Sequence, residues 1–481
     1  MRVRKKSAIH LCLAGGLVLL TVQLMLLGLL LYPQAQPRYF PASDASILAN
    51  VSDRLGVRVF LVDPQSLQRV SAGRGDRGRT CVSCPHAFVA LLQAGSTIQE
   101  EFVYAMQEKN FHIAIIYNVK PRELASDIPS KAPIGYFLKR NAAIQLVVFY
   151  EREGNYWWHG SINSDPDAPV KLRELGLSIY SLDFMRNEGA YEKFEITLSH
   201  DFQVPMNVPK DSVQFLREKS NSRFIECSVA RMNEFYRIYG KNVTQETMKF
   251  SHRAWKLLSR AKTVLDKLNV RFWLSSGTCL GYYRQCGIIP YSKDVDIGIF
   301  ITDFSENILP EFVAHGFSLK HWFGKINDSL EMSFMSNGIK LDIFFFYEDG
   351  PWLWNGGTQA KSGRKFRYLF PRFTLCWTEF LELKVRVPCE TKAYIEANYG
   401  PDWFTPVTQW DWKSSPPNVR ENGRWPEHEW PHVIRVITFD PHTPSCVKPN
   451  IVDSTVIVNG YGKAELVHEN CVKVERAGFY L

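Results

Sequence analysis

One segment near the amino terminus constrains this chain more than any other: residues 8–32 contain no charged side chain and are dominated by Leu. A helix of about 25 residues, rising about 1.5 Å per residue, spans a hydrocarbon core of about 30 Å. Arg2, Arg4, Lys5 and Lys6 precede the segment, whereas residues 33–37 after it carry no charge. The positive-inside rule therefore predicts a single-pass type II membrane protein, with residues 1–7 in the cytosol and the chain after residue 33 in the lumen.

The alternative interpretation of residues 8–32 is a cleaved signal peptide. We favour an uncleaved anchor, because the apolar region is long for a signal peptide and no small-x-small cleavage site precedes Pro33. Sequons at Asn50, Asn242 and Asn327 are compatible with a lumenal glycoprotein.

The cysteines also fit the lumen, where disulfides form. Cys12 lies in the predicted anchor, and the other nine of the ten cysteines face the lumen, so at least one thiol is left free or in an intermolecular bond. Cys81 and Cys84 have the spacing of a redox or zinc motif. Because no second pair accompanies them, we favour a structural disulfide or buried thiols.

The composition is that of a globular protein, with 45% apolar and 22% charged residues. A length of 481 residues accommodates an anchor and two ordinary domains. The net charge of +8 includes the four basic residues before the anchor, and no run of Lys and Arg follows it. We therefore expect no nucleic-acid partner.

Local patterns divide the lumenal part into a stem linker (residues 33–52), a mixed α/β domain (53–240), a second domain (241–437) and a tail of unknown role (438–481). In the first domain we expect strands at 57–62, 113–117, 144–150 and 156–160, the last two joined in a hairpin at Asn155, and helices at 87–92 and 97–107. An amphipathic helix at 255–268 opens the second domain. The expected fold class is α/β (α+β), with a mixed sheet in the second domain.

The second domain carries carboxylates in apolar runs. Asp294 and Asp296 lie two residues apart, so on a strand both point to one face while Val295 points to the core. Two like charges held close are costly unless a partner such as a hard divalent cation neutralises them. Asp342 stands alone in another apolar run, where a buried charge also needs a partner.

A short turn of small residues, Ser276, Gly277 and Thr278, precedes an expected helix at 279–285. Backbone N–H groups at a helix start bind phosphate. Arg284 and Lys293 can add positive charge, although each is equally consistent with a surface role. An isolated Asp-x-Asp is more often a turn or a solvated edge, but the order of turn, helix, paired aspartates and third aspartate predicts a site for metal-bound phosphate.

The motifs of this region resemble the LicD family within the nucleotidyltransferase fold. The family core reads roughly G-T-x-L-G-x-x-R, then I-P-W, then an acidic cluster ending D-x-D. This chain has Gly-Thr-Cys-Leu-Gly at 277–281, Arg284, Ile-Pro-Tyr at 289–291 and Asp-Val-Asp at 294–296, and Tyr-Gly-Pro-Asp-Trp at 399–403 is similar to the closing Y-G-x-x-W element. Segments at 155–160, 222–227, 344–347, 354–361 and 376–379 are similar to the fukutin branch of that family, and the resemblance covers residues 55–437.

The resemblance implies a nucleotidyltransferase-like catalytic domain in a Golgi membrane enzyme. It implies transfer of ribitol 5-phosphate from CDP-ribitol to the phosphorylated O-mannosyl glycan of α-dystroglycan, with release of CMP. Other Golgi enzymes of the same pathway, fukutin-related protein and the transmembrane ribitol-xylosyltransferase, are the implied partners. Two departures leave the number of metal ions open, because Ser292 replaces an Asp and Tyr291 a Trp of the LicD pattern.

In the expected mechanism, Asp294 and Asp296 bind Mg²⁺ or Mn²⁺, which holds the donor diphosphate. Asp342 is either a third ligand or the base that accepts the acceptor proton, and we expect a mixed role with the base dominant. The residues that we expect to bind phosphate oxygens are Ser276, Gly277, Thr278, Arg284 and Lys293. At residues 354–357 we expect either a loop near the site that contacts the cytidine or the acceptor, or a simple turn.

Two other classes of function are open. One is a non-catalytic scaffold of a Golgi glycosylation complex, and the other is a Mn-dependent glycosyltransferase that uses a nucleotide sugar. Three aspartates in apolar strands argue against the scaffold, which has no need of them. The small-residue turn and helix ahead of Asp294 favour nucleotidyltransferase geometry over the glycosyltransferase.

Overall fold

A computed structural model describes residues 23, 42–71, 85–93, 98, 100–119, 131–202, 204–241, 243–437, 446–447, 464–468 and 471–474. The predicted anchor apart from Gln23, the pair Cys81 and Cys84, and most of the tail lie outside these residues. None of the described helices is both long and apolar enough to cross a membrane. The chain divides into two compact units, Met1–Val229 with Cys376–Lys384, and Ala230–Leu375 with Val385–Leu481.

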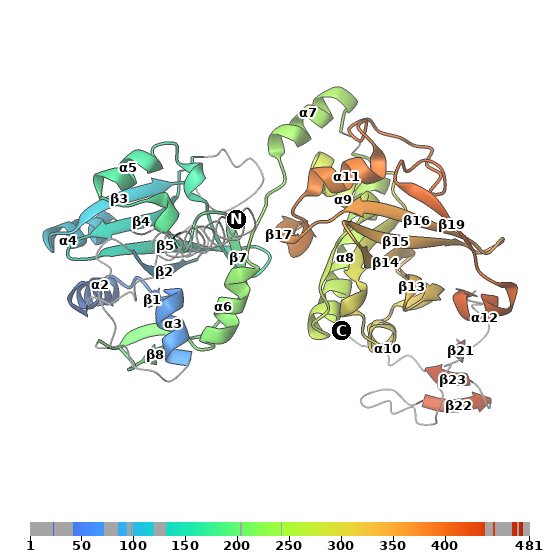
Figure 1. Ribbon diagram of the computed structural model, residues 1–481, viewed down its shortest axis with the longest axis horizontal. Helices are drawn as coiled ribbons and strands as arrows, with labels where there is room; N and C mark the ends of the chain where they lie inside the picture. The colour runs from blue at the N-terminus through green and yellow to red at the C-terminus, as the bar shows by residue number, and fades with distance from the viewer. Residues whose placement is uncertain are drawn as a thin grey trace, which may run out of the picture. The chain divides into compact units, whose positions relative to one another are not determined.

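The first unit, blue to green in Figure 1, is built on a mixed sheet of strand order β1-β2-β5-β4-β3, extended from β5 by β6 and β7. The strands are β1 (Val59–Leu61), β2 (His86–Leu92), β3 (His112–Tyr117), β4 (Pro133–Lys139), β5 (Ala143–Arg152), β6 (Tyr156–His159) and β7 (Gly189–Tyr191). The helices are α2 (Ala42–Arg54), α3 (Pro64–Ser71), α4 (Glu100–Glu108), α5 (Ala168–Glu174) and α6 (Ser212–Ser220), and β8 (Ile196–Ser199) pairs with β9 (Met206–Pro209).

The helix predicted at residues 87–92 is wrong, because these residues belong to strand β2. The strand pairs antiparallel with β1 and parallel with β5, and most of its side chains are buried. A short apolar run is compatible with a buried helix or a buried strand, and here pairing along both edges decides the outcome. The other predicted strands, the helix at 97–107 and the hairpin at Asn155, whose φ is 57°, are confirmed.

The part of the predicted stem linker that the structure describes is helical and belongs to the first unit. Ala45, Leu48 and Val51 of α2 are buried in the core of this unit. Asp44 of the same helix accepts hydrogen bonds from the backbone N–H groups of Asn141 and Ala142, at 3.0 and 2.9 Å. Residues 42–52 are therefore packed structure rather than a linker.

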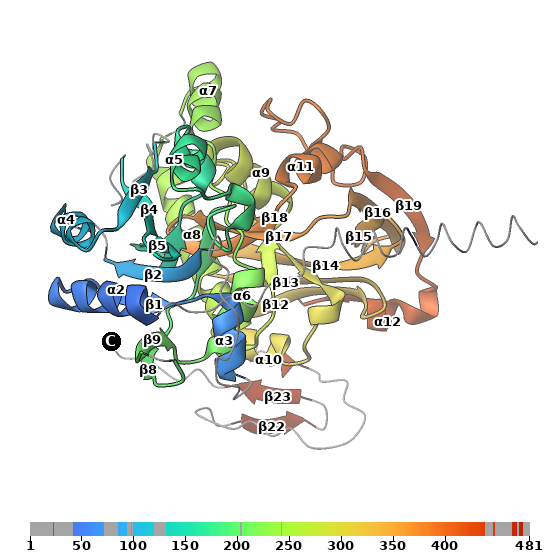
Figure 2. The same ribbon diagram turned by 60° about the vertical axis from the view of Figure 1, so that its left-hand side comes forward.

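The second unit contains a nine-stranded mixed sheet of order β19-β16-β15-β14-β13-β12-β20, in which β11 joins β14 and β10 joins β11. Figure 2 shows β14, β15, β16 and β19 following one another across it. The strands are β10 (Phe272–Leu274), β11 (Asp294–Phe300), β12 (Ser318–Lys325), β13 (Asp328–Ser336), β14 (Ile339–Asp349), β15 (Trp352–Gln359), β16 (Arg364–Pro371), β19 (Val419–Arg424) and β20 (Ile434–Val436).

The remaining elements are helices and two small sheets. The helices are α7 (Val229–Tyr239), α8 (Gln245–Lys267), α9 (Ser276–Gln285), α10 (Ile308–Ala314), α11 (Thr391–Tyr399) and α12 (Trp430–Val433). Strands β17 (Leu375–Phe380) and β18 (Leu383–Pro388) form a hairpin, and β21 (Cys446–Val447), β22 (Ala464–His468) and β23 (Cys471–Val474) form a separate sheet. Among the described cysteines, Cys279 is a buried free thiol, whereas Cys227, Cys286, Cys376 and Cys389 are disulfide-bonded.

The amphipathic helix predicted at 255–268 is confirmed as α8, which begins earlier than expected. Thr244 and Thr247 form a capping box at its start. Its buried side chains recur at the three- and four-residue spacing of one helix face: Ala254, Leu257, Leu258, Ala261, Val264 and Leu265.

The loop or turn predicted at residues 354–357 is wrong, because these residues lie within β15. Two adjacent glycines suggest a turn in the sequence, but here they allow close packing inside a sheet. A Cβ on Gly356 would come within 2.3 Å of the Cβ of Ser329, so no larger residue fits without a shift.

Candidate active site

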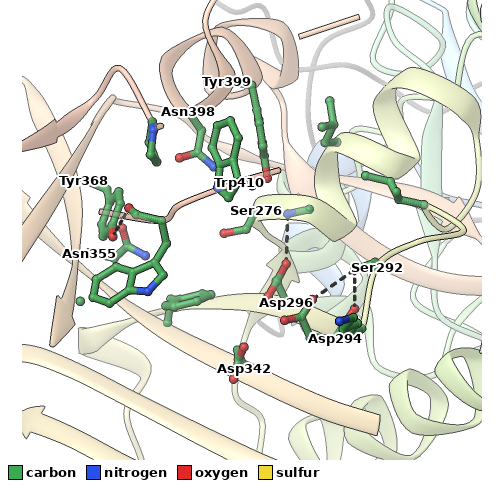
Figure 3. A pocket seen from close by; sticks show the side chains of 18 of the residues that line it. Ser276, Ser292, Asp294, Asp296, Asp342, Asn355, Tyr368, Asn398, Tyr399 and Trp410 are labelled. Atoms are coloured by element: carbon green, nitrogen blue, oxygen red, sulfur yellow. Dashed lines mark hydrogen bonds between the residues drawn. The ribbon is translucent and has the colours of Figure 1, made fainter. Parts of the chain in front are cut away.

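The register of the second sheet brings the three predicted aspartates together. Strand β11 runs parallel to β14, with Asp296 opposite Asp342 and Asp294 opposite Lys340. Residues two apart on a strand share a face, so all four side chains project from the same side of the sheet. One carboxylate oxygen from each of Asp294, Asp296 and Asp342 lies within 4.8 Å of the others, and Figure 3 shows the three side chains as one group.

Asp296 is hydrogen-bonded to the start of α9. The backbone N–H of Gly277 donates to its Oδ2 at 3.0 Å, and its own N–H donates to the Thr278 hydroxyl at 2.8 Å. Burial, together with the charges of Asp294 and Asp342, raises the pKa of the Asp296 carboxyl well above its ordinary value. The first turn of α9 therefore fixes the orientation of Asp296, whose carboxylate is repelled by those of Asp294 and Asp342.

Lys340 is a functional residue that the sequence reasoning missed. Its Nζ lies 2.6 Å from Asp342 Oδ2 and 3.5 Å from Asp294 Oδ2. Burial lowers the pKa of the Lys340 ammonium, but the carboxylates, chiefly Asp342, outweigh burial and raise it above its ordinary value. Lys340 precedes Asp342 by two residues, so strand alternation was the signal that could have placed both on one face.

Asp342 has a hydrogen-bond partner on each oxygen. Ser333 on β13 donates to Oδ1 at 2.6 Å, and the Lys340 ammonium contacts Oδ2. Burial raises the pKa of Asp342, and Lys340 and Ser333 oppose that rise. Ser333 is a second residue that the sequence reasoning missed, although it faces Asp342 across the β13–β14 pairing.

The predicted phosphate-binding residues have diverse positions. Ser276, Gly277 and Lys293 line the cavity above the aspartates, but the Gly277 N–H and the Thr278 hydroxyl are both engaged with Asp296. Arg284 borders the same cavity, yet only 1% of it is exposed: its guanidinium lies 4.6 Å from the centre of the Phe235 ring and donates to Gln285 at 2.9 Å. Ser276 and Lys293 are therefore the best placed of the set to meet a phosphate.

A cavity of about 610 Å³ lies over this face of the sheet. Its floor continues from the aspartates through side chains of five strands, β12 to β16: His321, Phe323, Glu331, Phe344, Asn355 and Tyr368. Its other side is formed by the start of α9, by α11 and by the segment that follows α11, including Asn398, Tyr399, Trp403, Trp410 and Trp412. A cavity of this size accommodates an extended nucleotide-linked substrate.

Two acidic groups near the aspartates have displaced pKa values. Burial, with a contribution from Asp342, raises the pKa of Glu331 to about 8. Burial, with a contribution from Asp296, raises the pKa of the Tyr399 phenol well above its ordinary value. A cavity whose ionisable groups are perturbed by burial and by specific charges is typical of an active site.

The residues fit a divalent cation. Three carboxylate oxygens within 4.8 Å of one another are the hard ligands that Mg²⁺ and Mn²⁺ prefer. Burial, together with the charges of Asp294 and Asp342, raises the pKa of Asp296, and a bound cation would relieve the repulsion among the three carboxylates.

A mixed sheet with paired aspartates on one strand, a third aspartate on its parallel neighbour and a helix start facing them defines a transferase of the nucleotidyltransferase type. The family model described as LicD/FKTN/FKRP, nucleotidyltransferase domain, matches residues 269–390, and the one described as Fukutin N-terminal matches residues 46–255. The chain belongs to this fukutin family, as its motifs predicted.

Curated relatives span most of the chain. The proteins called ribitol-5-phosphate transferase FKTN from Mus musculus and Homo sapiens are 46% and 45% identical over 395 residues, which cover 79% of this chain and 85% of each relative. An uncharacterised protein of Caenorhabditis elegans is 29% identical over 49% of this chain and 62% of its own length. A solved lincosamide antibiotic adenylyltransferase, at 15% identity and a TM-score of 0.20 over 32% of this chain and 85% of its own, is too distant to carry an argument.

Proposed function

We propose that this protein transfers ribitol 5-phosphate from CDP-ribitol to a hydroxyl of the phosphorylated O-mannosyl glycan of α-dystroglycan, and releases CMP. The observation that carries the proposal is the placement of Asp294, Asp296 and Asp342 on adjacent parallel strands beneath the start of α9. The relatives that cover most of the chain are named ribitol-5-phosphate transferase, which supports the transferred group.

Asp294, Asp296 and Asp342 are the residues that would hold Mg²⁺ or Mn²⁺, which when bound neutralises charge on a diphosphate and its leaving group. Gly277 and Thr278 keep Asp296 in position through the hydrogen bonds described above. Ser276 and Lys293, on the cavity wall, are placed to contact phosphate oxygens. An acceptor oxygen then forms a bond to the ribitol-bearing phosphorus as the bond to CMP breaks, and a carboxylate of the site takes the acceptor proton.

The purified protein should therefore release CMP from CDP-ribitol only when the glycan acceptor and Mg²⁺ or Mn²⁺ are present. The assay compares CDP-ribitol, other CDP-alditols and UDP-sugars with the phosphorylated O-mannosyl glycopeptide, and follows both CMP and the mass of the product. Transfer from a UDP-sugar would replace the proposal with a glycosyltransferase. A folded protein that turns over no donor would favour the scaffold.

We also propose that the protein is a type II protein of the Golgi membrane that works beside fukutin-related protein and the transmembrane ribitol-xylosyltransferase. The support is the uncharged segment at residues 8–32, with basic residues on one side only. Protease added to sealed Golgi vesicles should leave the chain after residue 33 intact until detergent is added. Digestion of the catalytic domain in intact vesicles would exclude this topology.

A further inference from the structure

The cavity over the second sheet has two ends of different chemistry. Three cationic side chains are among its described lining residues: Arg284 on α9, Lys293 immediately before β11, and Lys340 on β14 beside Asp342. Arg284 is almost fully buried, so Lys293 and Lys340 supply the charge at this end. Leu280, Ile289 and Tyr291 add apolar surface beside them. The end near α9 therefore suits a phosphate-linked nucleoside.

The other end is lined by hydrogen-bond acceptors and aromatic rings. Figure 3 shows Asn355 and Tyr368 together, apart from Ser292 and Asp294. Asn355 faces Tyr368 across the β15–β16 pairing, and Glu331 on β13 faces Phe344. Lys340 is the cation whose charge acts on Glu331, and its ammonium is paired with Asp342. His321 also lines the cavity, and burial lowers its pKa to about 4, so it is neutral at physiological pH. We call this end, made of Glu331, Asn355, Tyr368, Trp410 and Trp412, the aromatic end.

Asn355 supplies the observation that points to a ligand. The residue is 5% exposed, it lines the cavity, and its Oδ1 has no hydrogen-bond partner among the described residues. A buried amide oxygen without a donor is costly and rare in folded proteins. A ligand that brings hydrogen-bond donors would satisfy it.

The aromatic rings of this end are held by the sheet at Tyr368 and Trp412 and by helix α11 at Trp410. The Tyr368 hydroxyl donates to the backbone carbonyl of Trp412 at 2.8 Å. Gly357 leaves room for the Trp412 ring, because a Cβ there would lie 3.1 Å from it. Trp410 packs against Tyr399, with ring centres 5.0 Å apart. Both indoles are still partly exposed, at 40% and 39%, so each offers a face to a ligand.

We propose that the aromatic end binds the sugar of the acceptor glycan and that Asn355 determines its specificity. This inference rests on the proposed function. A sugar ring offers hydroxyl donors to the oxygens of Asn355 and Glu331, and C–H groups to the indole faces. A diphosphate is disfavoured there because none of the residues that make up the aromatic end carries a positive charge. The acceptor hydroxyl would then approach the aspartate group from the side opposite the nucleoside.

The test measures the Kd of two probes separately, the phosphorylated O-mannosyl glycopeptide and CDP-ribitol with Mg²⁺, for the wild-type chain and for Asn355→Ala. The Kd for the glycopeptide should rise about 5- to 100-fold, as for loss of one buried hydrogen bond. The Kd for CDP-ribitol should stay within about twofold. Asn418→Ala is the matched control, because Asn418 is also buried and donates to the Leu369 carbonyl at 3.0 Å but does not line the cavity.

If Asn355→Ala does not fold, Trp412→Ala provides the same test from an exposed position. It should also raise the Kd for the glycopeptide. Weaker binding of CDP-ribitol with unchanged glycopeptide binding would overturn the inference and leave the proposed function intact. Wild-type protein that binds no glycopeptide would also overturn it. A third outcome is that the protein binds the glycopeptide through Asn355 but does not bind CDP-ribitol. That result would support the acceptor site and contradict the proposed donor.

Discussion

Replacing Asp296 by Asn is expected to reduce transfer by at least about 10²–10³-fold, the scale for loss of one preorganised charge in an active site. The thermal stability of the variant in EDTA should equal or exceed that of the wild type. The reason is that burial, together with repulsion from Asp294 and Asp342, raises the pKa of the Asp296 carboxyl, and Asn removes the cost of the buried charge while keeping the shape. The measurements are the rate of CMP release and the Tm, each with EDTA and with Mn²⁺.

The Tm measured with Mn²⁺ distinguishes loss of metal binding from a change in the stability of the fold. Wild-type protein should gain Tm on adding Mn²⁺ because the ion binds the folded state, and the variant should gain less. Asp349→Asn, at the end of the neighbouring strand β14, is the control, since Asp349 is exposed and pairs with Arg367 at the surface, so its loss should change little. Normal transfer by Asp296→Asn, or by wild-type protein in EDTA, would remove the metal from the mechanism.

Patterns within single elements could be predicted from the sequence. The apolar run of β5, the three- and four-residue spacing of α8 and the shared face of Asp294 and Asp296 depend only on strand and helix periodicity. The order of the turn, the helix and the acidic runs is also read directly along the chain, and the family motifs added the nucleotidyltransferase fold. These features are local. They can be recognised in a single segment without knowing which strand or helix packs beside it.

Features set by pairing between distant segments could not be predicted. Strand β2 has the composition of a buried helix and becomes a strand because β1 and β5 pair with it. Lys340 and Ser333 join the site only through the register of β14 with β11 and β13. Asn355 lies in a Gly-containing segment that indicates a turn, and its place on the cavity floor follows from pairing with β16. Register between strands is fixed by long-range contacts that periodicity does not encode.

Replacing Asp342 by Asn separates its two possible roles. The turnover should fall by about 10²–10⁴-fold whether Asp342 is a ligand or a base, so the rate alone decides nothing. The sequence favoured the base, but the contacts favour the ligand: both oxygens already accept from Ser333 and Lys340, and one lies within 4.8 Å of Asp294 and Asp296. We therefore expect the variant to need more Mn²⁺ for half-maximal rate, and high Mn²⁺ to restore part of the turnover.

Ser333→Ala is the matched variant, because it removes the hydrogen bond to Asp342 Oδ1 and keeps the carboxylate. It should lower the apparent Mn²⁺ affinity by about 10- to 100-fold at most, as for loss of a group that orients a metal ligand, and full turnover should return at saturating Mn²⁺. An Asp342→Asn enzyme with unchanged Mn²⁺ dependence and no rescue would instead identify Asp342 as the base. Near-normal turnover would exclude both roles. Asp342 would then be a structural residue, the ion-pair partner of Lys340.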